Sequence, residues 1–237
     1  MNKPLSLTIA IPAYNEAASL PDVLKDSYAI APKYAKDFEI LVVNDGSTDG
    51  TEKVIATFLR DHPKTTVVTH KTNQGFSGAI KSCYRKASKD IIFLLPADGQ
   101  IDVSDIQKFW EVLPESDVVV GYRTHNPEPF TRKLNSFVFH TLYRTLFGVR
   151  LHEISTSILW RKKVLDSLDI TAIPRSALIE PEVVYKAWSA GWRFAQVPIP
   201  YYPRTGGTPK GANPLMVLIT LKELIKLWWK MRIYGAL

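Results

Sequence analysis

The sequence has little cysteine and no long apolar run. Cys83 is the single cysteine among 237 residues, so the chain can form no internal disulfide and supplies no thiolate cluster for zinc. No run of about eighteen apolar residues occurs, and the N-terminus becomes polar too soon for a signal peptide. We therefore expect a reducing compartment and no segment that crosses a membrane by itself.

Acidic residues are also in deficit. The chain has 30 Lys and Arg against 23 Asp and Glu, a formal net charge of +7, and should favour anionic partners. Nucleic acid, phosphorylated small molecules and an anionic lipid surface are all consistent with that charge. Apolar residues make up 46% and charged residues 22%, which excludes a disordered, collagen-like or disulfide-stapled chain and indicates a globular protein.

Short apolar and β-branched runs alternate with helical patterns in the first half. Runs of this kind are typical of strands buried on both faces of a parallel sheet, and the order predicts an open α/β sheet with Rossmann-like winding. In such sheets ligands bind beyond the carboxyl ends of the strands. The predicted strands are Leu7–Ile11, Glu39–Val43, Thr65–Thr69, Ile91–Leu95 and Asp117–Gly121, with helices at Thr51–His62 and Gly78–Ser88.

The second half predicts a helix over Phe130–Phe147, strands over 154–160 and 193–202, and a helix near Ile179–Ala190. A long helical pattern, Asn213–Tyr234, ends the chain. We predict one domain over 1–211 and a C-terminal amphipathic helix over 212–237.

Polar motifs follow three of the predicted strands. In VVNDGSTDGT, Asp45 could accept a hydrogen bond from a uracil or guanine N–H, and Asp49 with Glu52 is spaced as a helix capping box. A well-made turn would explain that motif too. In NQGFSGAI, Gly75 and Gly78 allow either close approach to a phosphate or sugar or tight helix packing.

LLPADGQ places Asp98 and Gln100 two residues apart, so in an extended segment both side chains point the same way. A carboxylate with a carboxamide oxygen suits Mg²⁺ or Mn²⁺ bridged by substrate phosphates, although Asp-Gly is also a common turn. The position after a central strand favours the metal.

IPAYNE, VVNDGSTDGT, NQGFSGAI and PADGQ occur in the order and at the spacings of glycosyltransferase family 2, which the chain resembles from Leu7 to about Lys210. The resemblance implies the inverting GT-A fold, a nucleotide-diphosphate hexose donor (UDP or GDP), and a Mg²⁺ or Mn²⁺ site at Asp98 and Gln100. The family usually has Asp-X-Asp where this chain has Pro96-Ala97-Asp98. Pro96 therefore leaves open a lowered metal affinity or a nucleotide-sugar-binding pseudoenzyme.

The later cations resemble those of the polyprenyl-phosphate sugar synthases, the group of dolichyl-phosphate mannose synthase and the undecaprenyl-phosphate glycosyltransferases. The resemblance implies that Arg123, Arg132 and Ser136 bind the acceptor phosphate, and that Asp98, Arg132, Ser136 and Arg204 are catalytic. The donor-binding residues that it implies are Pro12, Tyr14, Glu16, Asp45, Gly75, Gly78, Ala97, Asp98, Arg123, Glu182, Arg204 and Lys210.

The kind of acceptor depends on whether a general base is present. A hydroxyl acceptor needs a base, and LIEPEVV offers Glu180 and Glu182 but lacks the Glu-Asp pair of hydroxyl-using relatives. A lipid phosphate is already an anion, so we expect a polyprenyl phosphate acceptor. A polysaccharide or glycolipid hydroxyl, with Glu180 or Glu182 as base, is the alternative.

The C-terminal pattern predicts an interfacial helix on an anionic membrane, because Lys222, Lys226 and Lys230 form one stripe. We expect a cytoplasmic protein peripheral to the membrane, with a membrane-protein partner or a second copy as alternatives, and no nucleic acid. Phe130–Phe147 could form a second such surface or pack on the core. The apolar residues assigned to the C-terminal surface are Leu221, Leu224, Ile225, Trp228, Trp229 and Met231; those assigned to the second surface are Phe137, Phe139, Leu142, Tyr143, Leu146 and Phe147.

Overall fold

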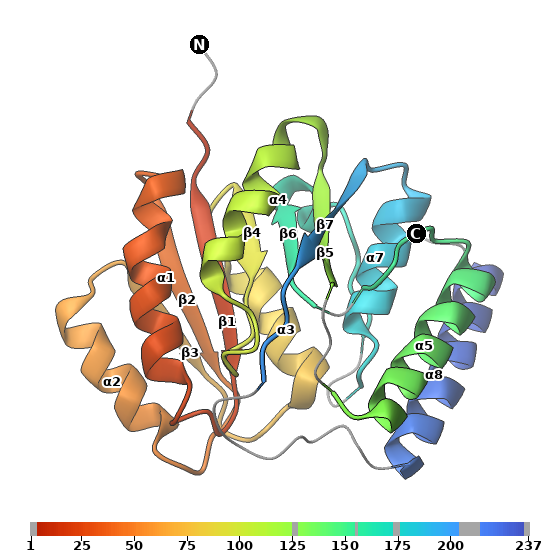
Figure 1. The fold of residues 1–237 in the computed structure, drawn as a ribbon, viewed down its shortest axis with the longest axis horizontal. Coiled ribbons are helices and arrows are strands. Elements are labelled where there is room, and N and C mark those ends of the chain that lie inside the picture. Colours follow the sequence, from red (N-terminus) through yellow and green to blue (C-terminus); the bar gives the residue numbers. More distant parts are fainter. Residues whose placement is uncertain (1–3, 125–127, 155, 173–175, 204–213, 235–237) are drawn as a thin grey trace.

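A seven-stranded mixed sheet forms the centre of the molecule (Figure 1). The structure is a computed structural model that describes residues 4–124, 128–154, 156–172, 176–203 and 214–234. The strand order is β3-β2-β1-β4-β6-β5-β7, and only β6 runs antiparallel to its neighbours. The strands are β1 Leu7–Ala13, β2 Phe38–Asn44, β3 Thr65–Thr69, β4 Ile91–Leu94, β5 Val118–Arg123, β6 Ile158–Arg161 and β7 Phe194–Ile199.

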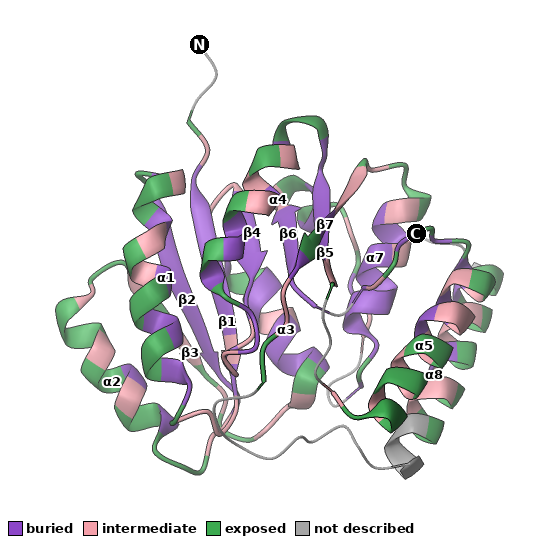
Figure 2. Ribbon diagram, viewed as in Figure 1, coloured by how far each residue is buried: buried purple, intermediate pink, exposed green. Residues whose placement is uncertain are grey.

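The central strands are buried on both faces, as their apolar sequences predict (Figure 2). Every residue of β2 and β4 is buried, and β1 and β2 pair in parallel register from Leu7 with Phe38 onward. β3 differs from the prediction, because its residues are only half-buried or exposed. It is one of the two edge strands of the sheet and has a neighbour on one side only.

Helices cover both faces of the sheet. α1, α2 and α4 contribute to one hydrophobic core, whereas α3, α5, α6, α7 and α8 contribute to the other. The predicted α/β class with a mixed, mostly parallel sheet and a C-terminal helix is therefore confirmed. The helices are α1 Leu20–Tyr34, α2 Thr51–Asp61, α3 Gly75–Lys86, α4 Ile106–Val112, α5 Phe130–Phe147, α6 Lys162–Asp166, α7 Ile179–Ser189 and α8 Pro214–Tyr234, with 3-10 turns at Val103–Asp105 and Leu113–Glu115.

α5 and α8 lie side by side at one end of the molecule (Figure 1). The assignment of Leu224 and Met231 to a lipid-facing surface is wrong, because both side chains are buried in the core. The same correction applies to Tyr143 and Phe147 of α5. No helix within the described residues is both long and apolar enough to span a bilayer. The predicted domain boundary at 211/212 lies outside the described residues.

The strand directions bring the polar loops together. The carboxyl ends of the six parallel strands share one edge of the sheet, and the antiparallel β6 begins at that edge. Six loop segments therefore lie side by side at this edge. They are the segments that follow β1, β2, β4, β5 and β7, and the segment that precedes β6. In open α/β sheets this is the edge where ligands bind.

Candidate active site

The loop after β1 is bound to the loop after β2. Asn15 has a left-handed backbone (φ 56°), its N–H donates to Ser47 Oγ at 3.0 Å, and its Oδ1 accepts from Thr48 N at 2.8 Å. Glu16 N donates to Thr51 Oγ1 at 2.9 Å. These bonds hold Tyr14 and Glu16, two predicted donor-binding residues, at the sheet edge.

Asp49 does not form the predicted capping box. The N-cap residue of α2 is Gly50, so Asp49 lies one residue before the N-cap. Asp49 instead accepts from Thr51 N and Oγ1 and from Ala17 N, which joins the two loops. Partial burial opposes the charge, but these hydrogen bonds outweigh it and lower the pKa of Asp49.

Asp45 is buried and holds the start of α3. Its Oδ1 accepts from Gln74 N at 2.8 Å and its Oδ2 from Gly75 N at 2.9 Å. His70 Nδ1 lies 2.6 Å from Asp45 Oδ1, and because a carboxylate only accepts, this nitrogen carries the proton. His70 Nε2 lies 2.8 Å from Ser82 Oγ. Asp45 thus has three internal donors, and a nucleobase N–H would be a fourth.

Asp98 and Gln100 lie in a turn after β4, not in an extended segment. Gly99 has φ 71°, and Gln100 N donates to Asp98 Oδ1 at 3.1 Å. The argument that an extended backbone aligns the two side chains is therefore wrong. The Gln100 carboxamide is buried: its Oε1 accepts from the Tyr201 hydroxyl at 2.9 Å, and its Nε2 donates to the Tyr202 carbonyl at 3.2 Å.

The oxygen donors of this turn suit a hard divalent ion. Asp98 offers a carboxylate, and a carboxamide oxygen such as Gln100 Oε1 has two lone pairs, one of which can accept from Tyr201. Among the described residues no group of three or more His, Cys, Asp or Glu could hold a metal. Mg²⁺ commonly binds to one or two carboxylates together with substrate phosphates, so the donor set fits an ion completed by a diphosphate.

Arg123 is the centre of a second cluster, at the end of β5. Its Nε and Nη2 donate to the Glu153 carboxylate at 2.9–3.0 Å, and its Nη2 also donates to Ser136 Oγ at 3.1 Å. Burial would lower the pKa of Arg123, but the ion pair with Glu153 outweighs burial and raises it. The structure thus brings Arg123 and Ser136 together, as predicted.

Arg132 lies one turn before Ser136 on α5. Its Nη1 pairs with Glu128 Oε2 at 2.5 Å. Each predicted arginine of the acceptor site that the structure describes is therefore matched by a glutamate. Two further predicted site residues, Arg204 and Lys210, lie outside the described residues.

Comparison with known proteins decides the family. A sequence model described as Glycosyl transferase family 2 matches residues 8–169. The chain belongs to glycosyltransferase family 2. The predicted resemblance is confirmed, and the chain is a glycosyltransferase.

Several relatives of this family 2 protein are named for lipid phosphates. It is 28% identical to the undecaprenyl-phosphate mannosyltransferase of Micrococcus luteus over 86% of each chain. It is 25% identical to the polyprenol monophosphomannose synthase of Mycolicibacterium smegmatis, over 86% of this chain and 81% of the relative. An uncharacterized glycosyltransferase of Mycobacterium tuberculosis is 30% identical over 89% of this chain and 91% of its own.

A solved structure shares the fold. Glucosyl-3-phosphoglycerate synthase from Mycobacterium tuberculosis, crystallised with Mn²⁺, UDP and glucosyl-3-phosphoglycerate, superimposes with a TM-score of 0.74 at 17% identity. The likeness covers 95% of this chain and 80% of that one. At this identity the likeness supports the fold alone.

The family 2 chain keeps both candidate bases of α7 inside the protein. Glu182 is buried, accepts from Thr171 N and Oγ1 at 2.7 Å each, and pairs with Lys186 at 3.2 Å. Among the contacts of the described residues, none joins Glu182 to the Asp98 or Arg123 clusters. Glu180 is 1% exposed, and burial raises its pKa to about 8.

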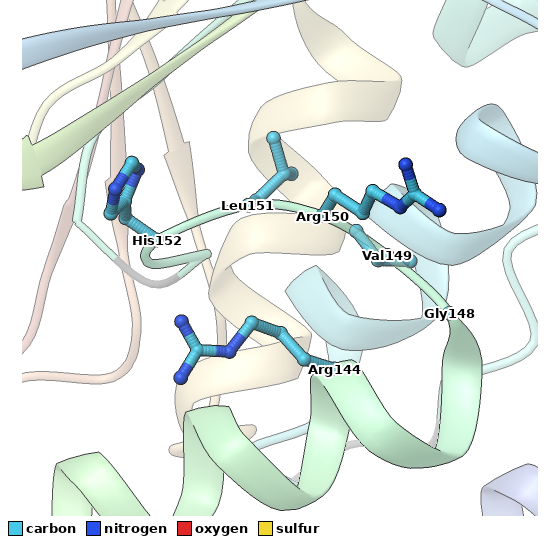
Figure 3. Close-up of a pocket in the computed structure, with 6 residues that line it drawn as sticks. All are labelled: Arg144, Gly148, Val149, Arg150, Leu151 and His152. Atoms are coloured by element: carbon cyan, nitrogen blue, oxygen red, sulfur yellow. The ribbon is translucent and has the colours of Figure 1, made fainter.

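A cavity of about 440 Å³ lies beside the segment that joins α5 to β6 (Figure 3). Arg144, Arg150 and His152 line it, and Figure 3 shows Arg150 and His152 at opposite ends of the segment. The His152 ring stacks on Tyr122 and bonds to Gln196. The three side chains do not converge on one point, so the cavity has no formed anion site.

Tyr201, Glu128 and His70 are site residues that the sequence did not reveal. Tyr201 contacts Gln100 and lies under the Arg123 guanidinium, 5.1 Å from the ring centre. Its place just before Arg204, at the end of the last predicted strand, was the available sign. Glu128 and His70 have no such sign, because each acts through a contact made by the folded chain.

We predict that Glu180 makes stability depend on pH. The folded protein keeps a proton that the unfolded chain loses above the usual glutamate pKa, so Glu180 lowers the free energy of unfolding as pH rises from about 5 to about 8. Glu180→Gln removes this titration. The free energy of unfolding of Glu180→Gln, minus that of the unsubstituted protein, should therefore rise with pH. The rise should be up to about 1.4 kcal/mol per pH unit.

Urea unfolding at pH 5, 6, 7 and 8 measures this difference. Glu52→Gln, at an exposed position of α2, is the control and should follow the unsubstituted protein. Parallel pH curves for Glu180→Gln and the unsubstituted protein would contradict the assignment.

Proposed function

We propose that this glycosyltransferase moves a hexose from a UDP- or GDP-sugar to a polyprenyl phosphate, with inversion at the anomeric carbon. One observation carries the proposal: Tyr201 contacts both Gln100, in the predicted metal turn, and Arg123, in the predicted acceptor-phosphate cluster. The groups proposed to bind the donor and those proposed to bind the acceptor share this neighbour, which supports transfer between the two ligands. Relatives named for undecaprenyl and polyprenol phosphates support this acceptor class.

The acceptor needs to be positioned rather than deprotonated. Arg123, Arg132 and Ser136 would bind the lipid phosphate, an anion at neutral pH, and aim one oxygen at the anomeric carbon. That oxygen forms the new bond to carbon as the carbon–oxygen bond to the nucleotide diphosphate breaks on the opposite face. The bonding pair leaves with the diphosphate, and the configuration inverts.

Charge on the leaving diphosphate must be stabilised. Asp98 and Gln100 would hold Mg²⁺ or Mn²⁺, and the bound ion supplies Lewis-acid stabilisation of that charge. Arg204 and Lys210 are proposed to act on the same phosphates. The remaining proposed donor contacts are Pro12, Tyr14, Glu16, Asp45, Gly75, Gly78 and Ala97. Glu182, which was predicted with them, is instead bound to Thr171 and Lys186.

The burial of the two α7 glutamates favours this acceptor over a hydroxyl. A general base must reach the proton that it removes. Glu182 is bound to Thr171 and Lys186, and burial favours the protonated form of Glu180 near neutral pH. Neither group is arranged to accept a proton from a sugar hydroxyl.

Asp98→Asn should lower the rate of sugar transfer at least about 100-fold, because it removes the carboxylate of the proposed metal site. Asparagine Oδ1 can still accept from Gln100 N, so the turn should fold normally. The rate of product formation from a radiolabelled nucleotide sugar, with Mn²⁺ or EDTA, measures the effect.

Asp102→Asn is the matched control, in the same loop. Asp102 Oδ1 accepts from Ser104 N at 2.8 Å, and asparagine caps helices equally well. Normal turnover by Asp98→Asn would refute the metal assignment. If the unsubstituted protein binds the nucleotide sugar normally but shows no turnover, the result would favour a pseudoenzyme.

We also propose that the enzyme lies on an anionic membrane, peripheral and on the cytoplasmic face, through α5 and α8. Exposed apolar side chains concentrate on these adjacent helices, where Lys222, Lys226 and Lys230 are exposed as well. Basic and apolar groups on one exposed surface are typical of interfacial helices. The exposed apolar residues are Phe130, Leu134, Phe137 and Val138 on α5 and Leu218, Ile219, Ile225, Trp229 and Ile233 on α8.

The double variant Trp229→Ser/Ile233→Ser should bind liposomes containing phosphatidylglycerol at least about tenfold more weakly. The two side chains are 56% and 65% exposed, so their substitution removes apolar area from the surface and not from the core. Co-sedimentation measures binding. Leu59→Ser on α2, at the far end of the molecule, is the control (Figure 1). Equal binding by all three proteins would refute this surface.

A further inference from the structure

Tyr201 lies two residues after the end of β7, between the two halves of the proposed site. Its hydroxyl donates to Gln100 Oε1 at 2.9 Å, and the Arg123 guanidinium lies 5.1 Å from the centre of its ring. Asp98, Arg123, Glu128 and Arg132 are all close enough to act electrostatically on its hydroxyl. One side chain therefore contacts, or lies near, charged groups of both halves.

The backbone after β7 fixes which way the Gln100 carboxamide faces. Tyr202 N donates to the Gln100 carbonyl at 2.9 Å, and Gln100 Nε2 donates to the Tyr202 carbonyl at 3.2 Å. A flipped carboxamide would place Oε1 against that carbonyl, so two acceptors would face each other and the bond to Tyr202 would be lost, although Nε2 could still donate to the Tyr201 hydroxyl. The amide nitrogen must therefore face Tyr202, and Oε1 must face the Tyr201 hydroxyl.

We propose that Tyr201 is a positioning residue that couples the metal half of the site to the acceptor-phosphate half. Its hydroxyl holds Gln100 Oε1 in the orientation for an ion, and its ring supports the Arg123 guanidinium. The inference rests on the proposed function. Groups that orient metal ligands in this way typically change metal affinity 10- to 100-fold when removed.

Two substitutions separate the hydroxyl from the ring. Tyr201→Phe removes the bond to Gln100 and keeps the ring under Arg123, whereas Tyr201→Leu removes both. Tyr34→Phe, at the end of α1 and packed on Trp110, is the matched control for loss of a phenol hydroxyl. Thermal unfolding would be measured for all variants.

The first measurement is Mn²⁺ affinity in the presence of UDP, from the electron paramagnetic resonance signal of free Mn²⁺. We expect Tyr201→Phe and Tyr201→Leu to weaken Mn²⁺ binding about tenfold or more, and Tyr34→Phe to leave it unchanged. The second measurement is the KM for farnesyl phosphate at saturating Mn²⁺. It should stay within about twofold for Tyr201→Phe and rise about threefold for Tyr201→Leu, as loss of a cation–π contact implies.

The outcomes separate this role from the function itself. If the unsubstituted protein binds Mn²⁺ with UDP and Tyr201→Phe binds it equally well, the role of the hydroxyl is overturned and the proposed function stands. If the unsubstituted protein binds no Mn²⁺, both the metal site and the coupling are overturned. An unchanged KM for farnesyl phosphate in a folded Tyr201→Leu would overturn the role of the ring.

Discussion

The antiparallel strand β6, inserted between β4 and β5, is the constraint on which the site depends. Neighbouring strands lie about 4.8 Å apart, so β6 separates the ends of β4 and β5 by about 10 Å. Asp98 follows β4 and Arg123 ends β5, so the proposed metal turn and the proposed acceptor-phosphate cluster come from two strands that β6 holds apart. Because β6 runs backwards, the segment before it returns to the same edge and brings Glu153 to Arg123. A parallel strand would place that segment at the opposite edge.

The two arginines of the proposed acceptor site are neutralised by neighbouring glutamates. Arg123 is paired with Glu153 and Arg132 with Glu128, so these four described residues are together neutral. A phosphate that binds to Arg132 competes with Glu128, whereas Glu153 holds Arg123 through Nε and Nη2. The buried glutamates of α7 are not part of these ion pairs. On the proposed function, the acceptor phosphate would therefore have to displace Glu128 from Arg132.

The parts of the fold that follow a simple periodicity could be predicted from the sequence. The buried runs predict β1, β2, β4 and β5, and the helix pattern over Phe130–Phe147 matches α5. α1 was not predicted, although Leu20, Val23, Leu24, Ser27 and Ala31 are spaced as one buried helix face, because prolines interrupt the pattern. α8 was predicted as a helix, but which of its apolar residues pack inside depends on the neighbouring helices.

The sequence proposes candidate site residues but not the contacts among them. The motifs place Asp45, Asp98, Gln100 and Arg123 at or just after strand ends, and the structure has them there. The turn at Gly99, the pairing of Glu128 with Arg132, and the contact of Tyr201 with Gln100 join residues that are remote in sequence or lie in irregular backbone. Such contacts are set by the folded chain, so no local pattern reports them.

The central claim is that the acceptor is a phosphate, which needs no general base. The most direct test offers the unsubstituted enzyme farnesyl phosphate or farnesol, with radiolabelled UDP- and GDP-hexoses and Mn²⁺. The account predicts a chloroform-soluble, acid-labile product with farnesyl phosphate and none with farnesol. Transfer to farnesol at a comparable rate would contradict it.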